Sequence, residues 1–331
     1  MAFAGMKTMG PECCCGGCMN IYTNSGPGII KGQADGSGWY TDSAALFGSR
    51  TFAQGYFDFV NQNYYTHSAI ATVERKLWRV DSEMASADNF YTAPADRVVG
   101  AVAVDPQREY VYYAARNTPD TQDVYIYRLD YDGSGEVELY TYNVGVSGIV
   151  THWITPTRDG QYLFYTRSYT GARKVFRLNA DGTGDTEIFD GTATGLITTL
   201  CVDNDNEYLF WSNVSYIYRS AWDGSGATII YDGATSPGPK PSHVSFRPRL
   251  GNWSHKNNRL YFYCGSSAAP TATGLGLYSM LSDGTDLRAE IVRPDFYDSV
   301  GGTPVDTRVT EEQSIQIGCG YETTGSGTMA S

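Results

Sequence analysis

The chain has 331 residues, of which 41% are hydrophobic, so it can bury one large core or two smaller ones. Its formal net charge is −12, which argues against the basic surface that nucleic acid or an anionic membrane requires. No run of 18 consecutive apolar residues occurs, which argues against a membrane-spanning helix. The 37 Gly and 26 Tyr suit pleated sheets joined by tight turns.

The chain begins with MAFAGMKTMGPECCCGGC, which lacks the apolar stretch that a secretory signal requires. We therefore expect a protein that stays in the cytoplasm, or one that leaves the cell by lysis or inside an assembled particle such as a virion. Residues 1–18 are expected to form a Cys-rich tail. A second tail is expected at 321–331, with the folded domain between them at 19–320.

The N-terminal tail contains Cys13, Cys14, Cys15 and Cys18. The spacing Cys15-x-x-Cys18 is that of metal ligands, but a structural zinc site usually joins two separated pairs and no second pair exists. Disulfides to a neighbouring chain, or to Cys319 near the other end, are favoured over a metal site. Unpaired thiols in a disordered tail are the remaining alternative.

A ten-residue pattern with an Asp-Gly turn recurs along the chain. The copies are IIKGQADGSG (29–38), LWRVDSEMAS (77–86), IYRLDYDGSG (126–135), VFRLNADGTG (175–184), IYRSAWDGSG (217–226) and LYSMLSDGTD (277–286). Asp-Gly between alternating bulky residues predicts a hairpin turn, and Gly accepts the positive φ that such turns need. Two copies are altered, since Glu83 replaces the turn Asp in one and Ser279 replaces the basic residue in another.

Two further elements precede most copies. One is an aromatic strand such as YLFYTRS (162–168), and the other is a strand of small and β-branched residues such as VGAVAVD (99–105). Four antiparallel strands in each of six units predict an all-β, six-bladed β-propeller. Because NIYTNS (20–25) lacks a preceding small-residue strand, we expect a closing blade built from both termini. The segment 302–310 is the expected partner, and the place of SIQIGCG (314–320) stays open.

The unit resembles the YWTD repeat of the low-density-lipoprotein-receptor class of six-bladed propellers. That family carries Tyr-Trp-Thr-Asp, then Ile-x-Arg, then Asp-Gly-Ser. The matching pieces are LFWSN with IYRSAWDGSG, LFYTR with VFRLNADGTG, and VYYAA with IYRLDYDGSG, within residues 19–310. Arg167, Asn213 and Ala115 replace the last Asp of the tetrad, which puts its inter-blade hydrogen bonds in question. The resemblance implies the fold and does not by itself carry the receptors' function.

The last two turns are separated by an insertion at 232–259, which contains no acidic residue from position 240 onward. We interpret this reversal of charge as a docking loop for an acidic partner or a neighbouring subunit, with an aromatic anchor; a solvated loop is the alternative. The docking candidates are Lys240, Arg247, Arg249, Trp253, Lys256 and Arg259.

No motif of a hydrolase, metalloprotease or P-loop enzyme is present. DNDNE (203–207) resembles the start of a calcium loop, but it lacks the Gly and Glu that such a loop needs and fits a strand connection better. We assign no catalytic residue, cofactor or metal.

Three functions compete. The favoured one is a non-enzymatic structural or interaction propeller in a virion, tail or surface filament, bound to protein subunits and not to nucleic acid. An extracellular ligand-binding propeller is the first alternative. A lactonase- or lyase-like enzyme with an axial site is the second, and His152 and His243 are its best candidates.

Overall fold

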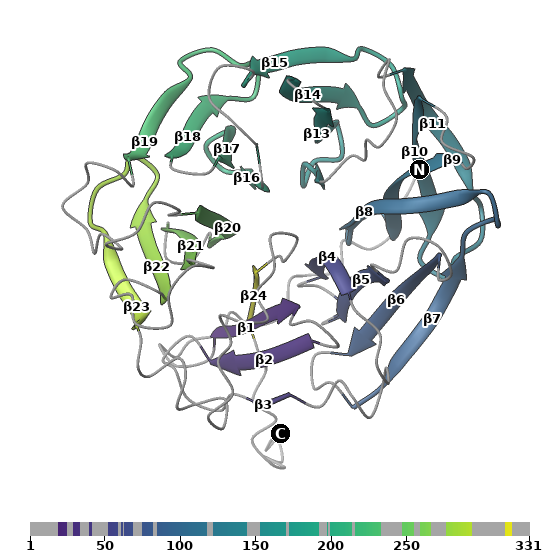
Figure 1. Ribbon diagram of the computed structural model, residues 1–331, viewed down its shortest axis with the longest axis horizontal. Helices are drawn as coiled ribbons and strands as arrows, with labels where there is room; N and C mark the ends of the chain where they lie inside the picture. Colours follow the sequence, from purple (N-terminus) through teal and green to yellow (C-terminus); the bar gives the residue numbers. More distant parts are fainter. Residues whose placement is uncertain are drawn as a thin grey trace, which may run out of the picture.

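The protein is all-β in its computed structural model, in which the described strands form six four-stranded antiparallel sheets arranged around a centre (Figure 1). The residues that the structure describes are 19–24, 29–33, 40–41, 52–58, 61, 63–68, 75–81, 85–117, 122–143, 153–169, 172–191, 197, 199–213, 216–232, 247–254, 259–265, 276–292 and 315–319. In this part of the chain no helix is long and apolar enough to cross a membrane.

Five sheets, B to F, are each formed by four consecutive strands. Sheet B contains β4 (Phe52–Asp58), β5 (Asn63–Ser68), β6 (Lys76–Asp81) and β7 (Ala87–Thr92). Sheet C contains β8 (Arg97–Asp105), β9 (Tyr110–Asn117), β10 (Asp123–Asp130) and β11 (Val137–Asn143). Sheet D contains β12 (Ile154–Pro156), β13 (Tyr162–Tyr169), β14 (Ala172–Asn179) and β15 (Thr186–Asp190). Sheet E contains β16 (Thr199–Asp203), β17 (Tyr208–Ser212), β18 (Tyr216–Ala221) and β19 (Thr228–Asp232). Sheet F contains β20 (Arg247–Ser254), β21 (Arg259–Gly265), β22 (Gly276–Leu281) and β23 (Arg288–Val292).

Sheet A combines strands from both ends of the described chain. Its order is β24 (Ile315–Cys319), β1 (Met19–Asn24), β2 (Ile29–Gln33) and β3 (Tyr40–Thr41). The expected pairing of strands from the two ends is present, and Met19 lies opposite Cys319. The partner is the segment whose place the sequence left open, whereas 302–310 lies outside the described residues.

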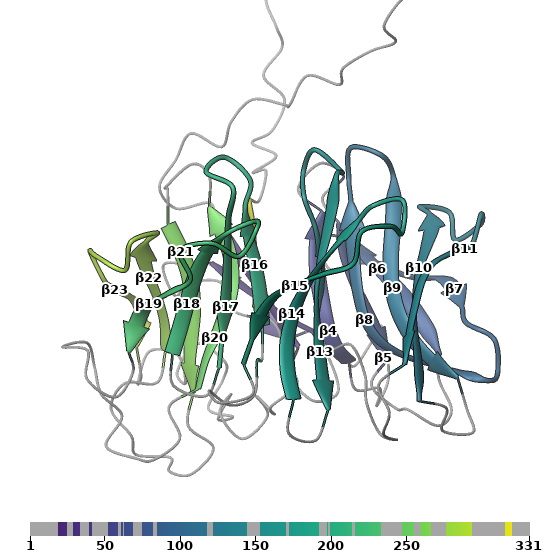
Figure 2. The same ribbon diagram turned by 90° about the horizontal axis from the view of Figure 1, so that it is seen from above.

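The first strand of each sheet lies nearest the centre, and these inner strands contact one another in the order β24, β4, β8, β12, β16, β20 and back to β24. The strands run roughly along the short axis of the molecule (Figure 2). The turns between first and second strands and those between third and fourth strands therefore share one face, because neighbouring strands are antiparallel.

The core follows the division of residue types that the sequence predicts. Ala101 and Ala103 on the inner strand β8 are fully buried, because small side chains fit where the sheets converge. The second strands carry the large aromatic residues, and Tyr113, Tyr165 and Trp211 are 0% exposed between neighbouring sheets. Aromatic burial of this kind supplies most of the apolar area that joins one sheet to the next.

The insertion at 232–259 is only partly a loop, which corrects one expectation from the sequence. Residues 247–254 form β20, the innermost strand of sheet F, and pair with β21. The preceding segment PSHVSF (241–246) also fits the pattern of small and β-branched residues, and it lies outside the described residues. The sequence misleads here because Pro248 and Gly251 resemble loop residues. The structure accommodates Gly251 within a register shift between Leu250 and Trp253.

Candidate functional site

The Asp-Gly turns connect the third strand of a sheet to its fourth strand, and they also pack closely against the preceding sheet. Their glycines have φ between +85° and +89°. These glycines are Gly133, Gly182, Gly224 and Gly284. A Cβ atom at Gly182 would lie 2.1 Å from the carbonyl oxygen of Leu139, the residue at the register shift of the outer strand before it. The turn glycine therefore serves both the backbone conformation and the close approach of two sheets.

The basic residue of the repeat fastens one sheet to the next. The Nη1 atoms of Arg79, Arg177 and Arg219 donate to backbone carbonyls in the following sheet, at 3.4, 3.3 and 3.0 Å. Each acceptor is the residue immediately before a turn Asp: Tyr131, Trp222 and Ser282, respectively. Two of these guanidinium groups also lie over a tyrosine of their own sheet, at 4.7 Å for Arg177 and 4.6 Å for Arg219. We call this arrangement the arginine clasp.

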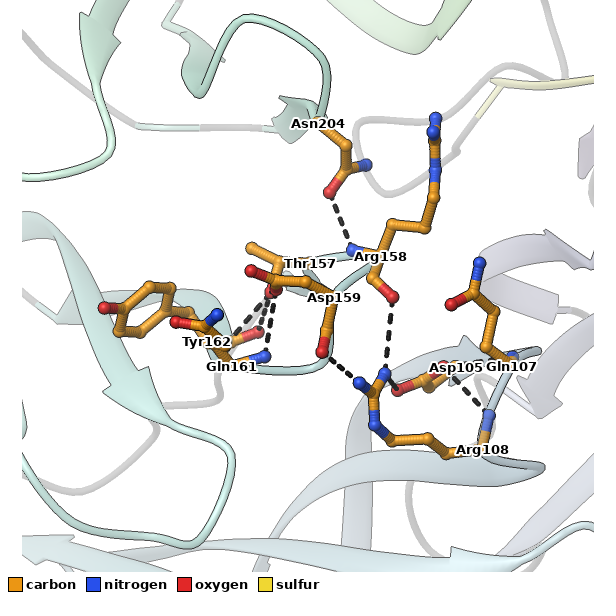
Figure 3. A network of polar contacts seen from close by, with 9 residues as sticks. All are labelled: Asp105, Gln107, Arg108, Thr157, Arg158, Asp159, Gln161, Tyr162 and Asn204. Atoms are coloured by element: carbon orange, nitrogen blue, oxygen red, sulfur yellow. Dashed lines mark hydrogen bonds and ion pairs between the residues drawn. The ribbon is translucent and has the colours of Figure 1, made fainter. Parts of the chain in front are cut away.

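Arg128, the corresponding residue of sheet C, lies over Tyr110 at 4.3 Å. Its guanidinium therefore packs within its own sheet. The joint from sheet C to sheet D instead uses the turns between first and second strands, as Figure 3 shows. Arg108 donates to Asp105 of its own turn at 2.9 Å and to the carbonyl of Arg158 in sheet D at 3.3 Å. The backbone N–H of Arg158 in turn donates to Asn204 of sheet E at 2.7 Å.

The acidic segment 203–207 is a strand connection, as predicted. Asp203 is fully buried, and its Oδ1 accepts from the backbone N–H groups of Asp205 and Asn206 at 3.0 and 3.2 Å. Its Oδ2 accepts from the Asn206 side chain at 2.7 Å. These bonds use the carboxylate to cap the turn between β16 and β17.

Two joints contain a cluster of tyrosines, one arginine and one carboxylate. At the joint between sheets B and C, Arg97 donates to Glu136 at 2.8 Å and to the Tyr113 hydroxyl at 2.9 Å. Glu136 also accepts from Tyr91 and Tyr113. Burial alone would raise the pKa of Glu136, but these hydrogen bonds and the charge of Arg97 hold that pKa below its ordinary value.

The joint between sheets C and D repeats this chemistry with different residues. Arg167 donates to Asp185 at 2.5 Å, and Asp185 also accepts from Tyr165 and Tyr140 at 2.5 and 2.9 Å. The guanidinium lies 4.1 Å from the ring centre of Tyr142, on the outer strand of sheet C. Arg167 occupies the last position of the YWTD-like tetrad. This position therefore does join two sheets, but with an arginine in place of the aspartate of the YWTD pattern.

Neither of these clusters was predicted from the sequence. Their signal is an acidic residue directly after the turn motif, since Glu136 follows DGSG and Asp185 follows DGTG. The partner arginine has no fixed position in the repeat. Arg97 begins β8, whereas Arg167 lies in β13, so comparison of the copies could not align them.

Tyr56 of β4 lies at the inner ends of the sheets. Its ring packs against the apolar clusters on both sides of sheet C. Burial is the main reason that the pKa of Tyr56 is raised. This side chain of sheet B therefore contributes to the cores on both sides of sheet C.

Most of the predicted site residues lie outside the described structure. These residues are Cys13, Cys14, Cys15, Cys18, Lys240 and Lys256, together with the enzymatic candidates His152 and His243. Cys319 ends β24, whereas Arg247, Arg249 and Trp253 lie on β20 and not on a loop. Among the residues that the structure does describe, no three His, Cys, Asp or Glu side chains gather where they could hold a metal ion.

Arg259 does not belong to the predicted docking surface. Only 5% of this residue is exposed, and its Nε donates to Ser279 Oγ at 2.8 Å. Its Nη1 donates to Asp286 at 2.7 Å in the same sheet. The sequence placed Arg259 in a basic loop, but the paired strand β21 begins at this residue and turns the side chain inward.

The fold is similar to that of solved β-propellers. A chain in the crystal structure of a nidogen/laminin complex matches with a TM-score of 0.62 and 12% identity, over 90% of this chain and 98% of that one. An oligogalacturonate lyase in complex with manganese matches with a TM-score of 0.52 and 14% identity, over 82% of this chain and 78% of that one. No family model matches the chain, and no curated protein matches it by sequence. The chain is thus a β-propeller of four-stranded sheets, and at such low identity the likeness concerns the fold alone.

Proposed function

We propose that this chain is a non-enzymatic structural and protein-interaction propeller, a component of a larger assembly such as a virion, tail or surface filament. In this proposal residues 19–320 form one six-bladed ring of the YWTD class, with sheet A as the closing blade. The Cys-rich segment at 1–18 cross-links or docks the ring to its neighbours, and the basic segment at 240–259 provides a second contact.

The use of the polar side chains supports this proposal. The arginines and carboxylates of the joints bind one another or the backbone of the next sheet, as Arg167 and Asp185 do at 2.5 Å. Tyr56, on the inner strand β4, packs against the apolar clusters on both sides of sheet C. The polar chemistry of the described residues therefore serves cohesion between sheets.

The pairing of β1 with β24 is the contact that a covalent closure of the ring would reinforce. Met19 lies opposite Cys319, and Cys18 is the residue before Met19 in the sequence. Because successive side chains of a strand alternate between faces, a bond between Cys18 and Cys319 requires the chain to leave the regular strand before Met19. A bond between Cys18 and Cys319 would hold the two ends of the ring together, and it would leave the other N-terminal thiols for neighbouring chains.

The native mass of the protein with and without reductant tests this proposal. We expect disulfide-linked multimers in light scattering, and their conversion to smaller species by reductant or by replacement of Cys13, Cys14, Cys15 and Cys18 with Ser. Cys201→Ala is the matched control, because this thiol is buried in β16 and should not take part. A monomer under every condition would contradict cross-linking, and peptide mapping would show whether Cys18 and Cys319 are joined.

The basic segment needs a separate test. Lys240, Arg247, Arg249 and Lys256 are replaced together by Gln, while Arg259 is kept because it binds inside sheet F. We expect weaker assembly, with a smaller dependence on salt concentration, since the segment would then attract acidic neighbours less. Unchanged assembly in low salt would remove this segment from the proposal.

The two alternative functions predict different results. A ligand-binding propeller would be a monomer that captures one soluble partner. A lyase-like enzyme would purify with a divalent metal ion in stoichiometric amount, which elemental analysis of the protein would detect.

A further inference from the structure

The outer strand of sheet E, β19, lies at an edge where another strand can add. It ends the order β16-β17-β18-β19, so it pairs with β18 on one side and with no described strand on the other. It runs along the outer rim of the propeller (Figure 1). The edge of a sheet is a template for pairing with another chain, and proteins commonly prevent this with charged side chains on the edge strand.

Four other sheets carry such a charge at the start of the outer strand. We define the outer triplet of a sheet as the three residues centred on the one that lies opposite the basic-residue position of the repeat. The triplets are ADN (87–89), EVE (136–138), DTE (185–187) and LRA (287–289) in sheets B, C, D and F, and ATI (227–229) in sheet E. Each of the first four contains an exposed charged residue, namely Asp88, Glu138, Glu187 and Arg288. The triplet of sheet E is exposed throughout and has no charge.

Ile229 makes this edge apolar as well as uncharged. It is 48% exposed, and it stands where sheets C and D have Glu138 and Glu187. All three residues lie opposite the aromatic residue of the third strand, which is Tyr218 in sheet E. A register shift beside this position occurs in each of sheets B to F, so the irregularity does not distinguish β19 from the other outer strands. The difference is the side chains at the start of the strand.

We propose that β19 pairs in antiparallel fashion with β19 of a second copy of this chain, so that the two sheets E form one continuous sheet. The contact is centred on the first three residues of the strand, Thr228, Ile229 and Ile230. This inference rests on the function proposed above, because it names another copy of the chain as one of the protein partners.

The charge of the chain favours a second copy at this edge. With a net charge of −12, two copies repel each other wherever their carboxylates meet, and the outer triplet of sheet E is the one of the five that brings no charge to the contact. Antiparallel pairing also places Asp232, the acidic end of one strand, beside the uncharged beginning of the other at Thr228. The two Asp232 carboxylates therefore lie at opposite ends of the contact. A two-fold arrangement of this kind closes as a dimer and does not grow into a filament.

The contact should be weak by itself. β19 has five residues, and a pair of such strands covers far less than the interface of about 1,200 Å² that a stable complex buries. We therefore expect a dimer that dissociates on dilution. Linkage of two copies elsewhere would strengthen this pairing by raising the effective concentration of one β19 near the other.

Analytical ultracentrifugation of the full chain in reductant tests the proposal without any contribution from disulfides. Ile229→Glu gives β19 the glutamate of the other sheets, and we expect the dissociation constant of the dimer to rise at least about tenfold. Val137→Glu is the matched control. It adds the same charge to β11 at a residue that is 42% exposed, and it should change the constant by less than about twofold. Added salt should strengthen the dimer by screening the repulsion of two acidic copies, whereas it should weaken a contact made by the basic segment at 240–259.

A charge-swap mixture tests whether the two strands face each other. Ile229→Glu and Ile229→Lys should each be largely monomeric, and their mixture should form a dimer at least about tenfold tighter than either variant alone. A monomer at every concentration and salt level would overturn the pairing. So would an equal loss in Ile229→Glu and Val137→Glu, which would make net charge the cause, or a mixture no tighter than its components. The disulfide-linked multimers are measured without reductant, so cross-linking through the cysteines stands or fails separately.

Discussion

The joint between sheets C and D and the joint between sheets D and E solve the same packing problem with different chemistry. The first holds Arg167 and Asp185 among tyrosines. The second has Trp211 and Tyr218 stacked 5.5 Å apart with an interplanar angle of 3°. At the position of Asp185 it has Ala227.

The arginine and the carboxylate are absent together from the joint between sheets D and E. Asn213 stands where sheet D has Arg167, and its Oδ1 accepts from the backbone N–H of Tyr216 at 2.7 Å. Losing one partner of a buried ion pair is strongly destabilising, whereas losing both and filling the space with apolar groups is often neutral. In these two joints the arginine and the carboxylate are thus kept or lost as a pair.

Removing the buried indole of Trp211 should have the largest effect on stability. Trp211→Ala leaves a cavity where the indole is 0% exposed, and we expect the free energy of unfolding to fall by about 4 kcal/mol. Ile229→Ala is the matched control. Ile229 lies opposite Tyr218 at the outer end of the same row and is 48% exposed, so its change should stay below about 0.5 kcal/mol. Urea unfolding measures both, and similar losses would show that the indole is not the main support of this joint.

Breaking the ion pair should have the next largest effect. Arg167→Met leaves the Asp185 carboxylate with a side chain only 18% exposed and no cation, so we expect a loss of about 3 kcal/mol. Arg158→Met removes an exposed partner of Asp205 and should change stability by less than about 1 kcal/mol.

A double substitution sharpens this second test. Arg167→Met combined with Asp185→Ala imitates the uncharged joint between sheets D and E, so it should recover at least half of the loss. A double variant no more stable than Arg167→Met alone would contradict the idea that the two charges are kept or lost together.

The comparison of joints also shows what could be predicted from sequence. The repeat predicted the turn glycines because Asp-Gly specifies a local conformation that is visible in any copy. The arginine clasp could not be predicted from the repeat, because its acceptor is a backbone carbonyl of another sheet, such as that of Ser282 for Arg219. The inward orientation of Arg259 depends on Ser279 and Asp286, and only the fold brings all three residues into contact.

Acid should weaken the joint between sheets B and C, which contains Glu136. The pKa of Glu136 is held below its ordinary value by Tyr113, Tyr91 and Arg97, against the opposing effect of burial. A carboxylate with a lowered folded-state pKa contributes stability above its unfolded value of about 4.3, and this contribution is lost as the pH falls through the folded-state pKa. Glu136→Gln should therefore reduce the fall in stability between about pH 6 and about pH 3, by about 1 kcal/mol. If the wild type and the variant lost the same unfolding free energy as the pH fell, this carboxylate would not be holding the joint together.

The smallest effect is expected from adding a carboxylate to the joint that lacks one. Ala227→Glu places an acid at the position of Asp185 with no arginine beside it, since Asn213 occupies the position of Arg167. Ala227 is exposed, so the new side chain can remain in solvent, and we expect a change within about 0.5 kcal/mol. One other outcome is informative. The indole N–H of Trp211 is buried without an acceptor among the described residues. If Ala227→Glu stabilised the protein by more than about 1 kcal/mol, the carboxylate would be reaching this donor. A carboxylate would then improve a joint without an arginine, and the rule that the charges are kept or lost as a pair would fail.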